Sequence, residues 1–261
     1  ADFETYDDLI EEGQKLPDDV ALLSLPDSSA TWLNWRILYR QQGGREFDEE
    51  GRIAFDNEKA LVALRKLNQM VDAGITDKTT AWQQSWFNRF AEGTTTSWIN
   101  GSWFMGTLAS SVPDTEGNWR AARIPAIESG GNRATFAGGS GIVFPAQGDE
   151  ARARRAMDFV LSTSTSQEEM GELFASDGNI SASRDAWGAP QYSEGVDFLG
   201  GQEAGTMWTD VASNIPPFSY NADSSVIMKD LNPLLKDVLW GDKSPEAALD
   251  EWVSTAQDRT G

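Results

Sequence analysis

The chain has 261 residues, 39% of them hydrophobic and 10% aromatic, which suits a globular protein of one or two domains with a substantial core. Its 41 acidic and 21 basic residues give a net charge of −20, and this field excludes nucleic acid and anionic lipid as favoured partners. Cysteine and histidine are both absent, which excludes disulfides, thiolate nucleophiles, Cys/His zinc sites and imidazole catalysis.

Helix signals dominate the first part of the chain. Thr5 followed by Asp8 predicts a capped helix start, and Asn57 can cap a helix whose apolar stripe reaches Val71. We expect helices from Thr5 to before Pro17, over 32–40, from Asn57 to before Gly74 and over 85–91, with one short strand over 20–25.

The rest of the chain alternates apolar strand-like stretches with amphipathic helical patterns. Ser244 followed by Pro245 is typical of a helix start. We expect strands over 119–124 and 135–144, helices over 149–161, from Ser166 through Phe174, over 226–239 and from Ser244 onward, and an irregular segment over 178–205. Because helices outweigh strands and the two types alternate, the sequence predicts an α/β protein.

Two segments carry the strongest indication of function. The first, Asn100-Gly101-Ser102-Trp103, follows an apolar stretch and precedes helix-compatible sequence, so it places a tryptophan at a strand-to-helix turn. The second, residues 135–141, is a glycine-rich turn without the spacing of a phosphate or dinucleotide loop. An aromatic ring can cover the C–H face of a sugar while backbone amides bond its hydroxyls. The pair therefore suits a neutral polyhydroxylated ligand.

Four further segments accompany this pair in a fixed order. They are Phe3–Leu9, Phe55–Ala60, the run from Phe90 to Gly93 that precedes Ile99–Trp103, and Gly241–Asp250. Together, the order and spacing of all these segments resemble the family 1 extracellular solute-binding proteins, the sugar-capture components of ABC importers. The resemblance implies the type II fold of periplasmic binding proteins.

Members of that family begin with a lobe of their own before the segment that Phe3–Leu9 resembles. The resemblance therefore implies that this chain holds the second lobe and a remnant of the first. The second lobe would comprise residues 1–137 and 187–261, and residues 138–186 would return to the first lobe. In the family, sugar binds between two lobes that close by hinge bending. A missing segment or a separate chain would complete the first lobe.

The resemblance also suggests which side chains contact the ligand. Trp103 is preferred as a sugar-stacking residue over an ordinary core residue, and one of Trp32 and Trp35 should face the ligand, with Trp35 preferred. The glycines are explained equally well by a turn with positive φ. The predicted contacts are Trp103, Trp35, Trp32, Gly138, Gly139, Ser140, Phe218, Tyr220 and Arg184, with no catalytic residue, metal ligand or cofactor expected.

The implied function is non-catalytic binding of a mono- or oligosaccharide for the membrane subunits of an ABC importer. The implied location is outside the cytoplasm, at the cell surface or in the periplasm, and any lipid-bearing cysteine would precede Ala1. Two alternatives stay open. One is a carbohydrate-active hydrolase, which also uses carboxylates and tryptophans. The other is a truncated lobe that acts as an interaction module.

The charge of −20 has two interpretations of its own. An acidic surface is tolerable at high salt because ions screen the repulsion between like charges. The alternative is that the acidic field recruits a cationic ligand. We favour the first interpretation, which predicts a halophilic protein.

Overall fold

The structure is a computed structural model that describes residues 3–144 and 149–260. The chain divides into two compact units, each with a core of its own. Unit 1 comprises Ala1–Ile99, Arg123–Ala137 and Asn214–Gly261, and unit 2 comprises Asn100–Ala122 and Gly138–Ser213. The boundary at Ala137 coincides with the expected one, whereas the other unit boundaries differ from the expected lobe boundaries. Which lobe each part belongs to stays a prediction.

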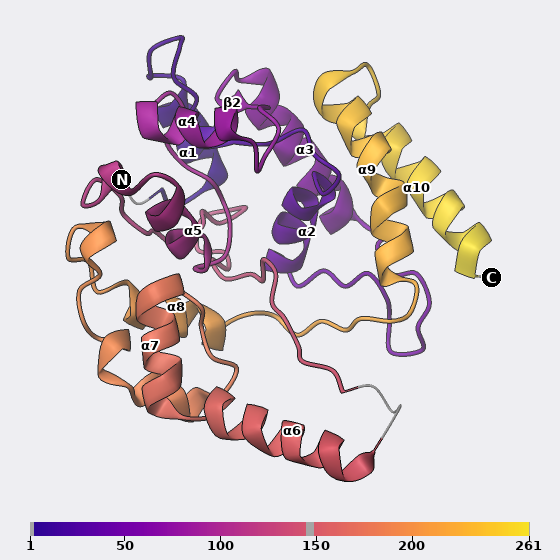
Figure 1. Cartoon of the computed structure of the whole chain (residues 1–261). Coiled ribbons are helices and arrows are strands. Elements are labelled where there is room, and N and C mark those ends of the chain that lie inside the picture. Colours follow the sequence, from indigo (N-terminus) through magenta and orange to yellow (C-terminus); the bar gives the residue numbers. More distant parts are fainter. Residues whose placement is uncertain (1–2, 145–148, 261) are drawn as a thin grey trace. The chain divides into compact units, whose positions relative to one another are not determined.

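Unit 1 pairs a short parallel sheet with helices. Leu23 lies opposite Thr76 in the sheet, and the segment after α4 extends it through a hydrogen bond from Ser24 N to Ser97 O of 2.8 Å. Figure 1 shows α9 running beside α10. The elements are α1 (Tyr6–Gly13), β1 (Leu23–Ser24), α2 (Trp32–Gln41), α3 (Glu58–Asp72), β2 (Thr76–Asp77), α4 (Gln84–Glu92), α9 (Ser224–Trp240) and α10 (Pro245–Thr260).

Local capping starts two of these helices as predicted. Thr5 N donates to Asp8 Oδ2 at 2.8 Å and Asp8 N donates to Thr5 Oγ1 at 3.2 Å, which completes a capping box. The side chain of Asn57 accepts a hydrogen bond from Ala60 N at 3.1 Å. Each cap satisfies backbone N–H groups that the helix itself leaves without partners.

Aromatic rings from three segments form the core of unit 1. Trp35 stacks on Tyr39 with ring centroids 4.5 Å apart and meets Trp252 edge-on at 4.8 Å. Phe55 stacks on Trp252 at 3.7 Å. Both buried indoles have polar partners, because Trp35 Nε1 donates to Ala60 O and Trp252 Nε1 donates to Ile227 O. This core fixes α2, and therefore the side chains that α2 presents to the surface.

Unit 2 is built from helices and short turns. Phe174 stacks on Tyr192 with centroids 4.4 Å apart, and Trp208 meets Phe174 edge-on at 6.0 Å. Its elements are α5 (Phe104–Ser111), η1 (Pro113–Thr115), α6 (Glu150–Ser164), α7 (Gln167–Asp177), η2 (Arg184–Gly188), η3 (Pro190–Tyr192), η4 (Asp197–Leu199) and α8 (Ala204–Ser213).

Helix α6 contributes no buried side chain to the core of unit 2. None of its residues is buried, and Met157, Phe159 and Leu161 are 43%, 69% and 51% exposed. Such a series of exposed apolar side chains is unusual on a soluble monomer. Within the ranges 3–144 and 149–260, no helix is both long and apolar enough for a membrane span.

Three strand predictions need correction. The strand expected over 20–25 is reduced to Leu23–Ser24, and residues 119–124 and 135–144 form no regular strand. The amide of Gln202 accepts from Ala121 N and donates to Ala121 O, both at 2.8 Å, and so replaces a neighbouring strand. Gly138 and Gly139 have φ of +90° and +134°, which breaks the extended conformation of the second segment.

Candidate functional site

Trp103 is the residue that immediately precedes α5 in unit 2, as the sequence predicted. Its indole is half-buried and meets Phe104 edge-on with centroids 6.1 Å apart. A Cβ atom on Gly138 would lie 3.5 Å from Trp103 Nε1. The tryptophan turn and the glycine-rich segment, far apart in the chain, therefore lie side by side. Gly138, Gly139 and Ser140 are all exposed, so their backbone groups are accessible next to the indole.

The turn that carries Trp103 is held against the C-terminal end of α7. Gly178 follows that helix with φ +73°, and a Cβ atom there would lie only 2.4 Å from Ser102 O. A Cβ atom on Gly106 would lie 2.6 Å from Asp177 Cα. Both positions therefore require glycine, and the resulting close approach of α5 to α7 fixes the indole of Trp103.

In unit 1 the preference between Trp32 and Trp35 is reversed. Trp35 is fully buried in the aromatic core and offers no face to a ligand, so the preference for it was wrong. Trp32 is half-buried at the start of α2. Its backbone N–H donates to Asn232 Oδ1 at 3.0 Å, and Asn232 Nδ2 donates to Ser28 O at 3.0 Å. Helix α9 thus positions the first turn of α2.

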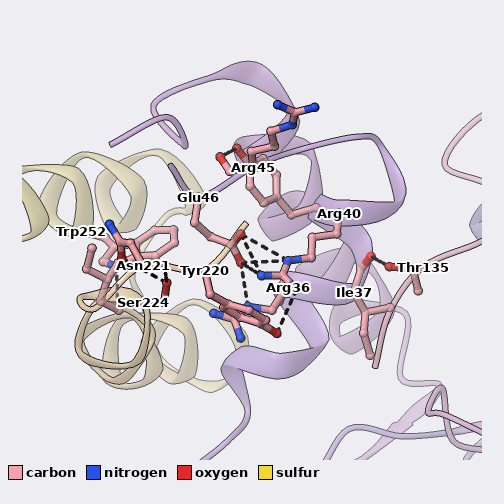
Figure 2. Close-up of polar contacts among 12 residues, drawn as sticks. Arg36, Ile37, Arg40, Arg45, Glu46, Thr135, Tyr220, Asn221, Ser224 and Trp252 are labelled. Atoms are coloured by element: carbon pink, nitrogen blue, oxygen red, sulfur yellow. Dashed lines mark hydrogen bonds and ion pairs between the residues drawn. The ribbon is translucent and has the colours of Figure 1, made fainter. Parts of the chain in front are cut away.

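One helical turn from Trp32, α2 carries a buried ion cluster that the sequence analysis did not predict (Figure 2). It consists of Arg36, Arg40 and Glu46. Glu46 Oε1 lies 2.7 Å from Arg36 Nε and 3.0 Å from Arg40 Nη2. The side chains of Glu46 and Arg40 are each 2% exposed and that of Arg36 is 8% exposed. Two guanidinium groups share one carboxylate, so the ion cluster has a net positive charge.

Aromatic rings surround this ion cluster. The Arg36 guanidinium carbon lies 4.6 Å from the ring centroid of Trp32 and 5.6 Å from that of Tyr220. Arg40 lies 3.9 Å from the ring of Phe218, and its Nη1 donates to the Tyr220 hydroxyl at 3.2 Å. Trp32, Phe218 and Tyr220 were all predicted contacts, and the structure brings them together. Tyr220 is 56% exposed, so a ligand can reach its ring.

Burial shapes the electrostatics of Arg36. Burial lowers the pKa of Arg36 below its ordinary value, the Glu46 carboxylate opposes that change, and the positive charge of Arg40 adds to it. Arginine remains protonated in proteins because its ordinary pKa lies far above neutral pH. Arg36 therefore keeps a charge that Glu46, shared with Arg40, compensates only in part.

Arg184 is an exposed residue of η2 in unit 2, where its guanidinium carbon is 5.6 Å from the ring of Trp187. The structure also contains an open hollow of about 470 Å³ in unit 1 and one of about 240 Å³ in unit 2. No predicted contact lines either hollow. The described residues contain no group of three or more Asp, Glu, His or Cys side chains that could hold a metal ion.

Solved structures define the class of fold. The sugar-binding protein MalE from Xanthomonas citri matches 99% of this chain with a TM-score of 0.76 at 17% identity. A binding protein of B. animalis subsp. lactis, solved with β-1,6-galactobiose, matches 98% with a TM-score of 0.77 at 16% identity. The chain covers 64% and 66% of these two structures. Its fold is therefore that of a large part of a type II periplasmic binding protein, as predicted.

The family follows from the sequence match. The family model described as bacterial extracellular solute-binding protein matches residues 1–199, which is most of the chain, and the chain belongs to that family. The arabinooligosaccharide-binding protein of Bacillus subtilis is 25% identical over 95% of the chain, and the maltooligosaccharide ABC transporter solute-binding lipoprotein of Streptococcus pneumoniae is 24% identical over 88%. The chain spans 59% and 53% of the lengths of these relatives.

Proposed function

We propose that this chain is part of an extracytoplasmic protein that binds a sugar or oligosaccharide and delivers it to an ABC importer. The observation that carries the proposal is the position of Trp103 beside the exposed backbone of Gly138–Ser140. The ring can take the C–H face of a sugar, and the adjacent amides can bond its hydroxyls. The names of two relatives specify oligosaccharides and support the same ligand class.

The proposal includes the absence of catalysis. The family is named for solute binding, and glycoside hydrolysis needs two carboxylates placed on either side of the scissile bond. Incubation with arabinooligosaccharides and maltooligosaccharides should leave both unchanged, as measured by chromatography of the products. Release of shorter sugars would favour the hydrolase instead.

We further propose that additional polypeptide covers α6 in the complete protein. The exposed Met157, Phe159 and Leu161 support this, because their side chains would otherwise remain in water. The expected cover is the rest of the first lobe, from the same or a separate chain. The proposed complete protein also carries a lipid anchor ahead of Ala1. Hydrogen exchange can test the cover. In the isolated chain α6 should exchange faster than α9, and equal protection would contradict the proposal.

Calorimetry on the protein at its full natural length tests sugar binding directly. Trp103→Ala should weaken binding by about 1–3 kcal/mol, or about 5- to 150-fold, because the sugar loses its apolar contact. Trp119→Ala is the matched control, since Trp119 is another half-buried tryptophan of unit 2 whose Nε1 donates to Thr115 Oγ1 at 2.7 Å. Equal affinities for both variants and the parent would remove Trp103 from the site.

A further inference from the structure

The ion cluster of Arg36, Arg40 and Glu46 has an unusual charge for a buried group. Transfer of charged groups out of water costs free energy, so the positive and negative charges in a buried ion cluster usually cancel. Here two guanidinium groups share one carboxylate, at 2.7 Å and 3.0 Å, within a chain of net charge −20. The charged and titratable groups that act on Arg36 are Glu46, Arg40 and Tyr220. One positive charge is therefore left without a counter-charge.

The uncompensated charge resides at the end of the Arg36 side chain. Its Nε lies 2.7 Å from Glu46 Oε1 and is buried without a hydrogen bond, whereas Nη1 and Nη2 are not among the buried nitrogens that lack a hydrogen-bond partner. Within the part of the chain that the structure describes, no residue accepts a hydrogen bond from these two atoms. The side chain is otherwise held in place, since it is 8% exposed and lies against the rings of Trp32 and Tyr220. Figure 2 shows the guanidinium next to the Tyr220 ring.

This arrangement matches a carboxylate attached to a sugar ring. A fixed guanidinium presents parallel N–H groups that pair with both oxygens of a carboxylate. The exposed face of Tyr220 and the half-buried indole of Trp32 can contact the C–H face of the ring that bears it. A neutral sugar would leave the charge of Arg36 uncompensated.

We propose that unit 1 binds a uronate unit of the sugar ligand, with Nη1 and Nη2 of Arg36 on its carboxylate. This inference rests on the proposed function and changes one expectation, because the sequence patterns favoured a neutral ligand. Those patterns lie at Trp103 and the glycine-rich segment of unit 2. The positive charge comes from unit 1, where the sequence analysis did not predict an ion cluster.

The test compares oligosaccharides that contain galacturonate or glucuronate with the same compounds after reduction of the carboxylate to an alcohol. The two probes differ only at C6, which carries a carboxylate in one and a primary hydroxyl in the other, and they share the ring and its hydroxyl groups. Calorimetry on the full-length protein should give about tenfold or more tighter binding of at least one uronate form. Arg36→Gln should remove this preference. Arg52→Gln should keep it, because Arg52 is an exposed arginine that pairs with Asp48 and Glu50.

The outcomes separate the two proposals. Binding of neutral or reduced sugars with equal or higher affinity would overturn the uronate proposal and leave sugar binding intact. Failure of every oligosaccharide to bind would overturn both. A preference for uronate that survives in a folded Arg36→Gln variant would also overturn the role of Arg36. Because the first comparison uses the unmodified protein, the conclusion does not depend on whether the variant folds.

Discussion

Glu46→Gln tests how the buried ion cluster of unit 1 is held together. The substitution keeps the shape of the side chain and removes the carboxylate that both Arg36 and Arg40 contact. The new amide nitrogen is a donor and would face donors of Arg40, whose Nε and Nη2 both reach Glu46 oxygens at 3.1 Å. Two buried guanidinium groups would then repel each other without compensation.

The expected loss of stability follows from burial. A pair of charges about 4 Å apart interacts by about 4 kcal/mol at an effective dielectric constant of 20, and Glu46 makes two such pairs. Burial of the carboxylate, which is 2% exposed, offsets part of this gain. Removal of one partner from a buried ion pair typically costs about 3–5 kcal/mol. For a protein of this size, that loss lowers the melting temperature by roughly 6–20 °C.

The measurement is denaturant or thermal unfolding at neutral pH, with Glu49→Gln as the matched control. Glu49 lies three residues further along the same segment, is 87% exposed and pairs with Arg45 at 3.9 Å. Its substitution should change the unfolding free energy by less than about 0.5 kcal/mol. If Glu46→Gln also stayed within about 1 kcal/mol of the parent, the inference that the carboxylate neutralises a buried pair of arginines would be wrong.

Two further predictions concern salt and alkaline pH. Because the net charge is −20, raising several different salts to molar levels should raise the melting temperature, and an unchanged or falling value would contradict the halophilic interpretation. Burial raises the pKa of Tyr39 to about 12, so the fold favours the neutral phenol. The contribution of this raised pKa to the free energy of unfolding should be complete below pH about 10. It should fall by up to about 2 kcal/mol as the pH rises towards 12. The difference in unfolding free energy between the parent and Tyr39→Phe should therefore shrink over this pH range. A constant difference would contradict the raised pKa of Tyr39.

Local signals predicted the starts of α1 and α3. The capping box at Thr5 and the cap at Asn57 act within three residues, so the sequence contains all the information they need. The strand predicted over 135–144 was wrong because Gly138 and Gly139 adopt positive φ, and the strand predicted over 119–124 was wrong because a strand depends on partners far away in the sequence. Gln202, for example, satisfies the backbone of Ala121 from far along the chain. Periodicity cannot reveal such a contact.

The candidate site was predictable only in part. The approach of Gly138 to Trp103 agrees with two segments that the sequence singled out. Trp32 and Trp35 could not be distinguished, because α2 has apolar residues on every side and most of the helix is buried. The ion cluster did have a local signal, since Arg36 and Arg40 are four residues apart and share one helix face. This signal did not include Glu46, the third member of the ion cluster, which lies beyond the turn that follows α2.

A loss of stability in Glu46→Gln would not distinguish an ion cluster needed for folding from one needed for ligand binding. Replacement of a whole buried ion cluster by apolar side chains is often neutral or stabilising by about 1–4 kcal/mol, because no charge then has to leave water. The triple variant Arg36→Met/Arg40→Leu/Glu46→Met should therefore unfold at the same temperature as the parent or higher. It should also lose any preference for uronate over the reduced sugar, since no positive charge remains in the cluster. A triple variant that is as unstable as Glu46→Gln would mean that the ion cluster is needed for folding, and its net charge would then require no ligand to explain it. Retained stability together with lost discrimination would assign the charge to ligand binding, because a chain selected for stability alone could replace all three side chains.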